Sequence, residues 1–357
     1  MGMSIIVNNR APMELFRIAS VSFCLFIVVN LYNNRYIEYL LIFHWQNYKQ
    51  QITIGLHGHC NRMIITNRQK EYAYKDIVTT IGKNKLKLFA FSFFFPIFAQ
   101  KLSDMSILII PDIHGRSFWE EAINDIAERR RDFDTVVFLG DYFDPYPAEG
   151  INECQAIINW EHLYDIFFGS YLTCEPVFLI GNHDAHYLNK VFAGRASGSR
   201  KSERHLHTIE GIFEDRHRMF QIAFDTTIGG KKVLFTHAGI NRGWVECHKD
   251  LLGTVSADSL NSLAKSDEGW LALADVGEER GGWAKTGGPM WADVSEHYDE
   301  DGKPYAIDGY DYEIFAHTRM KEPVINDTFA MLDAQRPFIL ADDCTIHEYS
   351  DADKLGL

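Results

Sequence analysis

The chain has 357 residues, of which 35 are Lys or Arg and 49 are Asp or Glu, so its formal net charge is −14. Its contents of 46% hydrophobic and 24% charged residues are ordinary for a globular protein, which excludes a globally disordered or collagen-like chain. The acidic balance argues against binding to the phosphate backbone of nucleic acids, so no nucleic-acid partner is expected.

The charge is divided unevenly near residue 104. Residues 1–104 hold 12 basic and five acidic side chains, a net charge of +7, whereas residues 105–357 carry −21. The first segment is crowded with Ile, Asn, Lys, Phe and Tyr, which A/T-rich codons encode, and Met105 directly precedes an apolar run. We therefore predict that residues 1–104 are a doubtful N-terminal extension with a mis-assigned start, and that residues 105–357 form one domain.

A membrane anchor is the alternative interpretation of the first segment. Residues 18–32 and 86–99 are apolar, but both runs are shorter than the roughly 20 residues that a spanning helix needs. The six cysteines are scattered without a C-x-x-C pair, which favours reduced thiols. A cytoplasmic protein is expected, and a membrane is expected as a partner only if residues 1–104 are expressed.

From residue 106 onward, apolar runs alternate with amphipathic stretches, which indicates an α/β domain. A helix is predicted over 117–131, where Ser117 and Glu120 form an expected capping box, and others over 153–168 and just after Asp184. Strands are predicted over 106–111, 135–139, 176–180, 232–236 and 312–316, followed by a β-rich tail over 324–349.

Each of the five predicted strands runs into a polar cluster. Ligands bind at the carboxyl ends of strands in open α/β sheets, so these clusters are expected to share one crevice. Their candidate ligands are two carboxylates, one amide and three imidazoles: Asp112, His114, Asp141, Asn182, His237 and His317. Any one cluster has an ordinary explanation as a turn, a helix cap or a buried histidine. Five together favour a site for a pair of divalent cations.

The order of motifs D-x-H, G-D-x-x-D, G-N-H-D, H-A-G and A-H-T resembles the calcineurin-like metallophosphoesterase superfamily. The resemblance covers nearly all of residues 105–357 and implies an α/β fold, a two-sheet β-sandwich flanked by helices on both sides. It is nearest to the protein serine/threonine phosphatase and diadenosine tetraphosphate hydrolase branch. Arg319 stands where many phosphodiesterase members carry a second histidine, and residues 289–293 resemble a Leu-Trp-x-Asp stretch of the protein phosphatases.

This resemblance implies two divalent metal ions (Mn²⁺, or an iron/zinc pair) and a phosphorylated substrate. Asp112 and His114 would hold the first metal, and Asp141 would bridge both. The second would be held by Asn182, His237 and His317. His183 would act as the general acid for the leaving oxygen, and Asp144 would fix its ring.

Two positions depart from the pattern of that branch. An arginine normally follows the G-D-x-x-D aspartate, where this chain has Pro145, and protein phosphatases carry another at the position of His186. Because both arginines normally hold the substrate phosphate, Arg116 and His186 are the candidates for that contact here. The basic stretch 194–207 is either a substrate-facing loop, with anion contacts from Arg195, Arg200, Lys201 and Arg204, or a solvated loop.

The sequence therefore predicts a binuclear metal-dependent phosphoric ester hydrolase of the phosphatase type, acting on a phosphoprotein or a small phosphomonoester. Two alternatives remain open. One is a diadenosine polyphosphate or nucleotide phosphodiesterase. The other is a phosphoesterase fold without catalysis that serves as a binding module, although this chain keeps every expected ligand and the histidine of the third motif.

Overall fold

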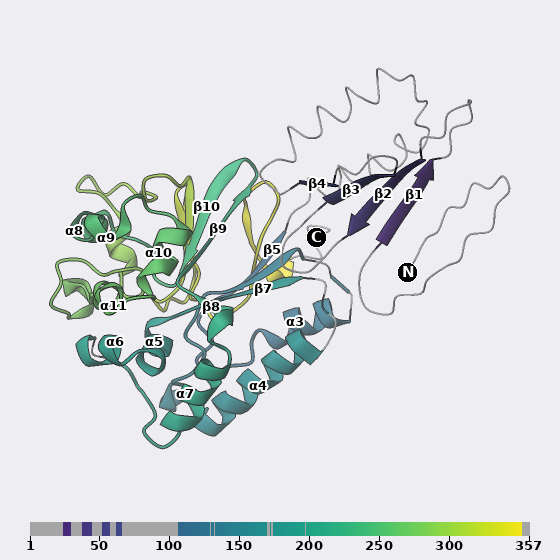
Figure 1. The fold of residues 1–357 in the computed structure, drawn as a ribbon. Coiled ribbons are helices and arrows are strands. Elements are labelled where there is room, and N and C mark those ends of the chain that lie inside the picture. The colour runs from purple at the N-terminus through teal and green to yellow at the C-terminus, as the bar shows by residue number, and fades with distance from the viewer. Residues whose placement is uncertain are drawn as a thin grey trace. The chain divides into compact units, whose positions relative to one another are not determined.

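The computed structural model describes residues 106–351, except 129, 132, 170–171, 173 and 197, together with four short strands nearer the N-terminus (Figure 1). The chain forms two compact units, residues 1–95 and residues 96–357. The four strands form an antiparallel sheet in chain order: β1 (Cys24–Val29), β2 (Glu38–His44), β3 (Ile52–His57) and β4 (Arg62–Ile65).

No helix within the described residues is both long and apolar enough to cross a bilayer. Part of the apolar run 18–32 forms β1, and the rest of that run lies outside the described residues, as does the whole of 86–99. The assignment of residues 1–104 to a doubtful extension stays a prediction.

Two mixed sheets form the second unit. The larger has the order β15-β14-β5-β6-β7-β8, in which β5 to β8 are parallel and β14 runs antiparallel to β5. Its strands are β5 (Ile107–Ile110), β6 (Thr135–Phe138), β7 (Glu175–Leu179), β8 (Phe220–Gln221), β14 (Phe338–Leu340) and β15 (Ile346–Glu348).

The smaller sheet has the order β12-β13-β11-β10-β9, with β10, β11 and β13 parallel. Its strands are β9 (Ala223–Ile228), β10 (Lys231–Thr236), β11 (Tyr312–Phe315), β12 (Val324–Ile325) and β13 (Phe329–Met331). All five strands predicted to carry polar clusters are therefore present, three in the larger sheet and two in the smaller one.

The two sheets pack face to face because their strands are apolar on both sides. Along β5, Ile107 and Ile109 join the core shared with Val233 and Phe235 of the other sheet, while Leu108 turns to the opposite face. Such two-sided burial is expected of strands covered on both faces. The arrangement confirms the predicted class, an α/β fold with two sheets and flanking helices.

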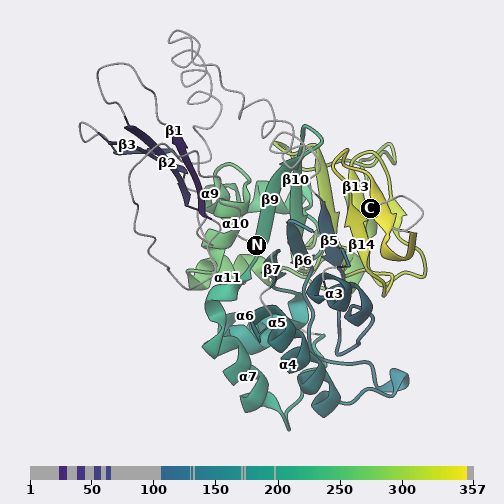
Figure 2. The ribbon, with the colours of Figure 1, turned by 90° about the vertical axis from the view of Figure 1, so that its right-hand side faces the viewer.

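Helices cover the outer face of each sheet (Figures 1 and 2). The larger sheet is covered by α3 (Glu120–Ala127), α4 (Glu153–Gly169) and α7 (Leu206–Asp215). The smaller sheet is covered by α5 (Asn182–Leu188), α6 (Lys190–Arg195), α8 (Arg242–Cys247), α9 (Lys249–Leu252), α10 (Ala257–Leu263) and α11 (Asp267–Leu273).

The predicted capping box of the first helix is wrong. The helix begins at Glu120 with Trp119 at its N-cap, and Trp119 makes no side-chain cap. Ser117 instead supplies its backbone oxygen to the Glu120 N–H at 3.0 Å, which leaves 117–119 in a turn. The short helix of the third motif starts at Asn182, three residues earlier than predicted, because the Gly181 backbone is already extended as a cap.

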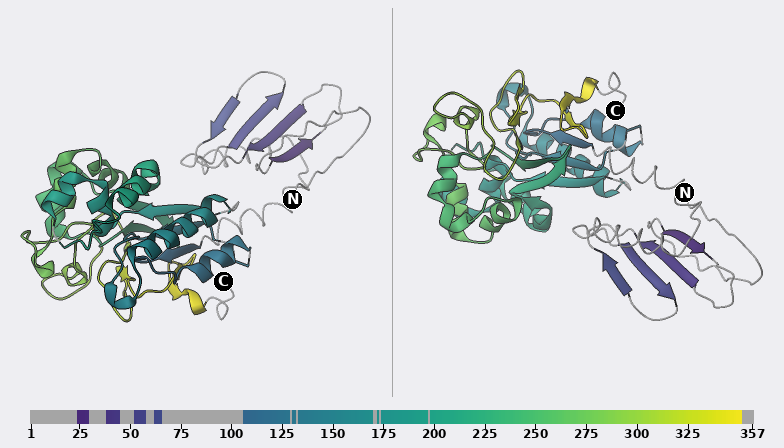
Figure 3. Two further views of the ribbon diagram at one scale, coloured as in Figure 1. Left: turned by 90° about the horizontal axis from the view of Figure 1, so that it is seen from below. Right: turned by 90° about the horizontal axis from the view of Figure 1, so that it is seen from above.

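The C-terminal strands of the domain pack beside its first strand and first helix. Strand β14 pairs with β5, and the Tyr349 hydroxyl donates to Asp125 on α3. Figure 3 shows the last described residues, in yellow, beside the blue helix α3. The first strand of the domain is thus an interior strand, which keeps the loop after it in a fixed place.

A buried carboxyl group secures the loop that follows β10. Glu313 on β11 is 1% exposed and accepts hydrogen bonds from the backbone N–H groups of Ile240, at 3.1 Å, and Ile307, at 2.7 Å. Burial raises the pKa of Glu313 from 4.5 to about 8 in spite of these two bonds. Ile240 lies three residues after His237, so Glu313 helps to position a predicted metal ligand.

Glu313 makes the stability of the fold depend on pH. Because its pKa is higher in the folded state, the folded protein binds more protons than the unfolded chain between pH 4.5 and about 8, and its contribution to stability is lost as pH rises through that window. We expect Glu313→Gln to flatten this decline by up to about 1.4 kcal/mol per pH unit. Denaturant unfolding at several pH values in that window measures it.

The matched control is Glu214→Gln, at an exposed position on α7. This variant should keep the wild-type slope of unfolding free energy against pH. Parallel slopes for wild type and Glu313→Gln would show that the group does not titrate as described.

Candidate active site

The predicted site residues lie where strands end, and several of them hold an uncommon backbone conformation. Positive φ angles occur at His114 (44°), Asp141 (53°), Asp144 (57°) and His317 (67°). Within the described residues only two other non-glycine positions have positive φ. Left-handed backbone in such residues is strained and persists where the surroundings enforce it, which is typical of functional sites.

The loops after β6 and β7 are packed directly on one another. A Cβ atom at Gly181 would lie 2.1 Å from Asp141 Oδ1, and one at Gly140 would lie 2.5 Å from the Gly181 nitrogen. The Asp184 carboxylate ties the two loops together, because it accepts from the backbone N–H groups of Asp141 at 2.7 Å, Gly181 at 2.9 Å and Tyr142 at 3.0 Å. The position of Asp141 therefore depends on the missing side chain at Gly181 and on the hydrogen bonds that Asp184 accepts from the backbone.

One group of donors centres on His237. Its Nε2 lies 3.0 Å from Asn182 Oδ1, 3.1 Å from His317 Nδ1 and 3.6 Å from Asp141 Oδ2. Its Nδ1 lies 2.8 Å from the Leu139 carbonyl, so the proton on Nδ1 is bonded there and the Nε2 lone pair faces the other three residues. Four of the six predicted ligands meet at this point.

The second group centres on His114. Its Nδ1 donates to the Phe143 carbonyl at 2.9 Å, and its Nε2 lies 3.4 Å from Asp141 Oδ2. Asp112, 1% exposed, accepts weakly from the His317 N–H at 3.4 Å and lies 3.7 Å from His237 Nδ1. The structure thus brings all six predicted ligands together, with Asp141 common to both groups.

Burial keeps the three imidazoles neutral. It lowers the pKa of His114 to about 3 and lowers the pKa of His237 and His317 as well. Burial also raises the pKa of Asp141, but nearby His237, His183 and His114 outweigh it and bring that pKa to about 2. Burial and the charges of Asp333 and Asp141 raise the pKa of Asp112. Neutral imidazoles and ionised carboxylates are the forms that bind metals.

These residues fit a pair of divalent cations. Ligand atoms of His114, Asp141 and His183, and separately of Asp141, His237 and His317, lie within 4.8 Å of one another. His317 Nε2 is buried and has no hydrogen-bond partner, although buried polar atoms are normally satisfied. Imidazole nitrogens that face each other and a shared carboxylate need a cation between them to become favourable.

His183 differs from the other histidines because a carboxylate holds its ring. Its Nδ1 lies 2.8 Å from Asp144 Oδ2, and the ring is 6% exposed on the first turn of α5. Asp144 also accepts from the hydroxyls of Tyr187 at 2.5 Å and Ser199 at 3.1 Å. Burial raises the pKa of Asp144, but the bonds from His183, Tyr187 and Ser199 lower it below its ordinary value. His183 Nε2 is the nitrogen left for chemistry.

The two predicted substrate contacts have other partners. The Arg116 guanidinium is buried and bidentate to Glu149, at 2.7 and 3.0 Å. His186 packs edge-on against Phe192, its Nε2 is buried without a hydrogen-bond partner, and burial lowers its pKa to about 4. Both side chains lie beside the candidate site, and their contact with substrate stays a prediction.

The basic stretch 194–207 reaches the site through Arg200. Arg200 Nη2 donates to the Asp144 carbonyl at 2.9 Å and lies 3.3 Å from His114 Nδ1. Arg195 instead stacks on the exposed Trp283, with its Cζ 3.6 Å from the ring centroid, and Lys201 Nζ donates to the His186 carbonyl at 2.9 Å. One of the four basic side chains named in the sequence is therefore next to a candidate ligand.

Sequence reasoning missed two charged residues at the site. Arg280 Nη2 donates to Thr318 Oγ1 at 2.5 Å, and its charge contributes to the lowered pKa of His317. Asp333 is 3% exposed, and its charge raises the pKa of Asp112. Asp333 follows β13, which is parallel to β11, so it stands at one more strand end. The usable signal was the position of Asp333 just after a strand of the β-rich tail.

The chain is similar to some known proteins. No curated protein matches the chain significantly. Among solved structures, a putative diadenosine tetraphosphatase is 16% identical, with a TM-score of 0.36 and coverage of 68% of this chain and 92% of that chain. A novel archaeal phosphodiesterase is 13% identical, with a TM-score of 0.29 and coverage of 68% and 98%. Neither similarity indicates a substrate.

A sequence model described as calcineurin-like phosphoesterase matches residues 105–319, which is more than half of the chain. The match contains all six candidate ligands, His183 and Asp144. The chain therefore belongs to the calcineurin-like phosphoesterase family and is a metallophosphoesterase with buried His/Asp clusters for metal.

Proposed function

We propose that the protein is a phosphatase that hydrolyses phosphomonoesters, on a phosphoprotein or a small molecule, with His183 as its general acid. The single observation that carries this proposal is the pairing of His183 with the ionised Asp144 next to two clusters of buried ligand atoms that share Asp141. A general acid beside a site for two divalent cations is suited to phosphoester hydrolysis, because the acid protonates the leaving oxygen and the cations neutralise charge on the phosphoryl group.

We assign one metal to Asp112, His114 and Asp141, and a second to Asp141, Asn182, His237 and His317. When bound, two divalent cations supply Lewis acidity, since they neutralise charge on a phosphoryl group and lower the pKa of water. The backbone carbonyls of Phe143 and Leu139 accept from the Nδ1 atoms of His114 and His237, which turns both Nε2 lone pairs toward the site.

His183 handles the proton of the reaction. Asp144 accepts a hydrogen bond from the N–H group at Nδ1, so the transferable proton is on Nε2. Water forms the new bond to phosphorus, and as the bond to the leaving alcohol breaks, the Nε2 proton goes to the oxygen of that alcohol. Tyr187 and Ser199 keep Asp144 in place and ionised, which maintains this tautomer.

The monoesterase assignment is supported by the sequence branch rather than by site geometry. Arg319 follows His317-Thr318 at the position where many phosphodiesterase members have a second histidine. Trp291, from the Pro-Met-Trp-Ala-Asp stretch, lies edge-on to His317 with ring centroids 5.7 Å apart. The diadenosine polyphosphate and binding-module alternatives are outcomes of the following experiment.

A panel of esters tests the proposal on the full chain. With added Mn²⁺ we expect hydrolysis of p-nitrophenyl phosphate, and slower hydrolysis of bis(p-nitrophenyl) phosphate, with a phosphopeptide and diadenosine tetraphosphate completing the panel. Removing metal with EDTA should abolish turnover, and Mn²⁺ should restore it, because the imidazoles of the ligand clusters are neutral and cannot replace the charge of the cations. Preference for the diester or the dinucleotide would favour the phosphodiesterase alternative, and turnover of none of them would favour a binding module.

Variants of the His183–Asp144 pair separate proton transfer from metal binding. His183→Ala should lower kcat for p-nitrophenyl phosphate by about 10²- to 10⁴-fold, while the metal content measured by elemental analysis stays at two per chain. Asp144→Asn should lower kcat less than His183→Ala does, because the His183 ring is still present and loses only its carboxylate partner. Loss of metal from His183→Ala would instead make His183 a ligand, as its closeness to His114 and Asp141 allows.

The chain offers a matched control for this pair. His248 Nε2 lies 2.7 Å from Asp275 Oδ2, so it forms another His–Asp pair outside the proposed catalytic set. His248→Ala should keep the wild-type kcat. An equal loss in both alanine variants would indicate a general effect of removing a His–Asp pair rather than catalysis by His183.

A further inference from the structure

Three arginines from distant parts of the chain gather around one aromatic ring next to the metal clusters. The Cζ atoms of Arg200, Arg319 and Arg116 lie 3.7, 4.8 and 5.3 Å from the centroid of the Tyr146 ring. Tyr146 itself lies edge-on to His114, with ring centroids 5.0 Å apart. The cluster of Tyr146 with these arginines, hereafter the arginine cluster, therefore adjoins a proposed metal ligand.

The arginine cluster carries more positive charge than its carboxylate partner balances. Glu149 is shared by two of the arginines, since its Oε1 lies 2.6 Å from Arg319 Nη2 and it is bidentate to Arg116. Arg200 bonds to a backbone carbonyl and has no carboxylate partner among the described residues. The buried Asp333 also acts on Arg116 and Arg319, so two carboxylates face three guanidinium groups and one positive charge is left in excess.

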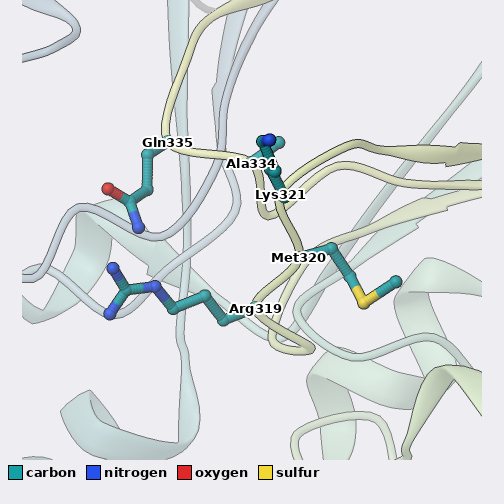
Figure 4. A pocket seen from close by; sticks show the side chains of 5 residues that line it. All are labelled: Arg319, Met320, Lys321, Ala334 and Gln335. Atoms are coloured by element: carbon teal, nitrogen blue, oxygen red, sulfur yellow. The ribbon is translucent and has the colours of Figure 1, made fainter.

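An open pocket of about 470 Å³ begins at the arginine cluster. It is lined by Arg319, Met320, Lys321, Ala334 and Gln335 (Figure 4). With its amide oxygen toward the guanidinium, Gln335 accepts from Arg319 Nη2 at 2.6 Å and Nε at 2.7 Å. Gln335 holds a positive φ of 54°, so its backbone is strained in the conformation that presents this side chain.

The pocket is suited to a phosphate group rather than to a nucleobase. Arg319 is held between Glu149 and Gln335 while 42% of its side chain stays exposed, and Lys321 adds an exposed ammonium group without an ion pair among the described residues. Among the described residues, no aromatic side chain lines the pocket, so the pocket itself offers no surface on which a base could stack. A guanidinium fixed in this way binds phosphate oxygens with directed, charge-assisted hydrogen bonds.

We propose that the arginine cluster and the adjoining pocket bind a second phosphate group of the substrate, beside the phosphate that is hydrolysed. This inference rests on the proposed function and narrows its substrate class to small molecules that carry two phosphates. It also gives a physical role to Tyr146, which follows Pro145. Where relatives of the phosphatase branch have one arginine at the position of Pro145, this chain gathers three around the next residue.

The test compares two sugar phosphates that differ by one phosphate group, on the full, Mn²⁺-loaded chain. Every protein, the reference termed wild type included, carries His183→Ala, so that hydrolysis does not consume the ligand during the titration. Calorimetric titration with fructose 1,6-bisphosphate should give a Kd about 10-fold or more below that of fructose 6-phosphate, because charge-assisted bonds to the second phosphate are present in only one ligand. Arg319→Gln should remove most of this ratio. Lys321→Gln, at an exposed position, should reduce it in the same direction and guards against misfolding of the first variant.

The control is another arginine that stacks on a tyrosine and pairs with a glutamate, outside the arginine cluster. Arg216 stacks on Tyr164, with its Cζ 4.1 Å from the ring centroid, and pairs with Glu161 at 3.0 Å. Arg216→Gln should keep the wild-type ratio of the two Kd values. Equal affinities in the wild type, or a ratio that survives both Arg319→Gln and Lys321→Gln, would overturn the second-phosphate subsite.

The binding measurement separates this inference from the proposed function. A chain that binds the bisphosphate preferentially through Arg319 but hydrolyses no ester would contradict the phosphatase and support the subsite. A chain that hydrolyses p-nitrophenyl phosphate but binds both sugar phosphates equally would support the phosphatase and contradict the subsite.

Discussion

Two carboxylates and three imidazoles lie close together at the ends of four strands, and the rest of the site is arranged around the electrostatic demand that this creates. The imidazoles are neutral, so their lone pairs face one another and the ionised Asp141 without compensation. A buried charge without a partner is unfavourable by several kcal/mol, and cations are the partners that this donor set selects. The family assignment and the geometry therefore both support a metal-binding site at these strand ends.

The sandwich makes this concentration of polar groups possible. Its interior is built from strands such as β5 and β6 that are apolar on both faces, so the polar residues are confined to the ends of the strands. The loops that follow these strands are strained: His114 and His317 have left-handed backbone conformations. The close packing of Gly140 on Gly181 holds two of the loops together. Stability of the core is what maintains the strained site.

The net negative charge of the domain contrasts with a local concentration of positive charge beside the site. The residues after 104 have a net charge of −21, yet one side of the site gathers Arg116, Arg200 and Arg319 around Tyr146. An acidic surface does not prevent binding of an anionic substrate when cations and fixed guanidinium groups set the local potential. The second-phosphate subsite extends the same principle from the metal centre to the pocket beside it.

The amino-acid sequence by itself determined the alternation of elements, five strand ends and six candidate ligands, because those depend on local hydrophobic pattern and on short motifs. It failed at the first helix cap, where Ser117 bonds through its backbone instead of its side chain. Only the tertiary structure decided which further charged side chains approach the site. Arg116 is paired with Glu149, whereas Arg200 reaches His114, and Asp333 comes in after β13. Such contacts join residues far apart in the chain, and no local pattern encodes them, since sheet pairing and loop packing alone set which side chains meet.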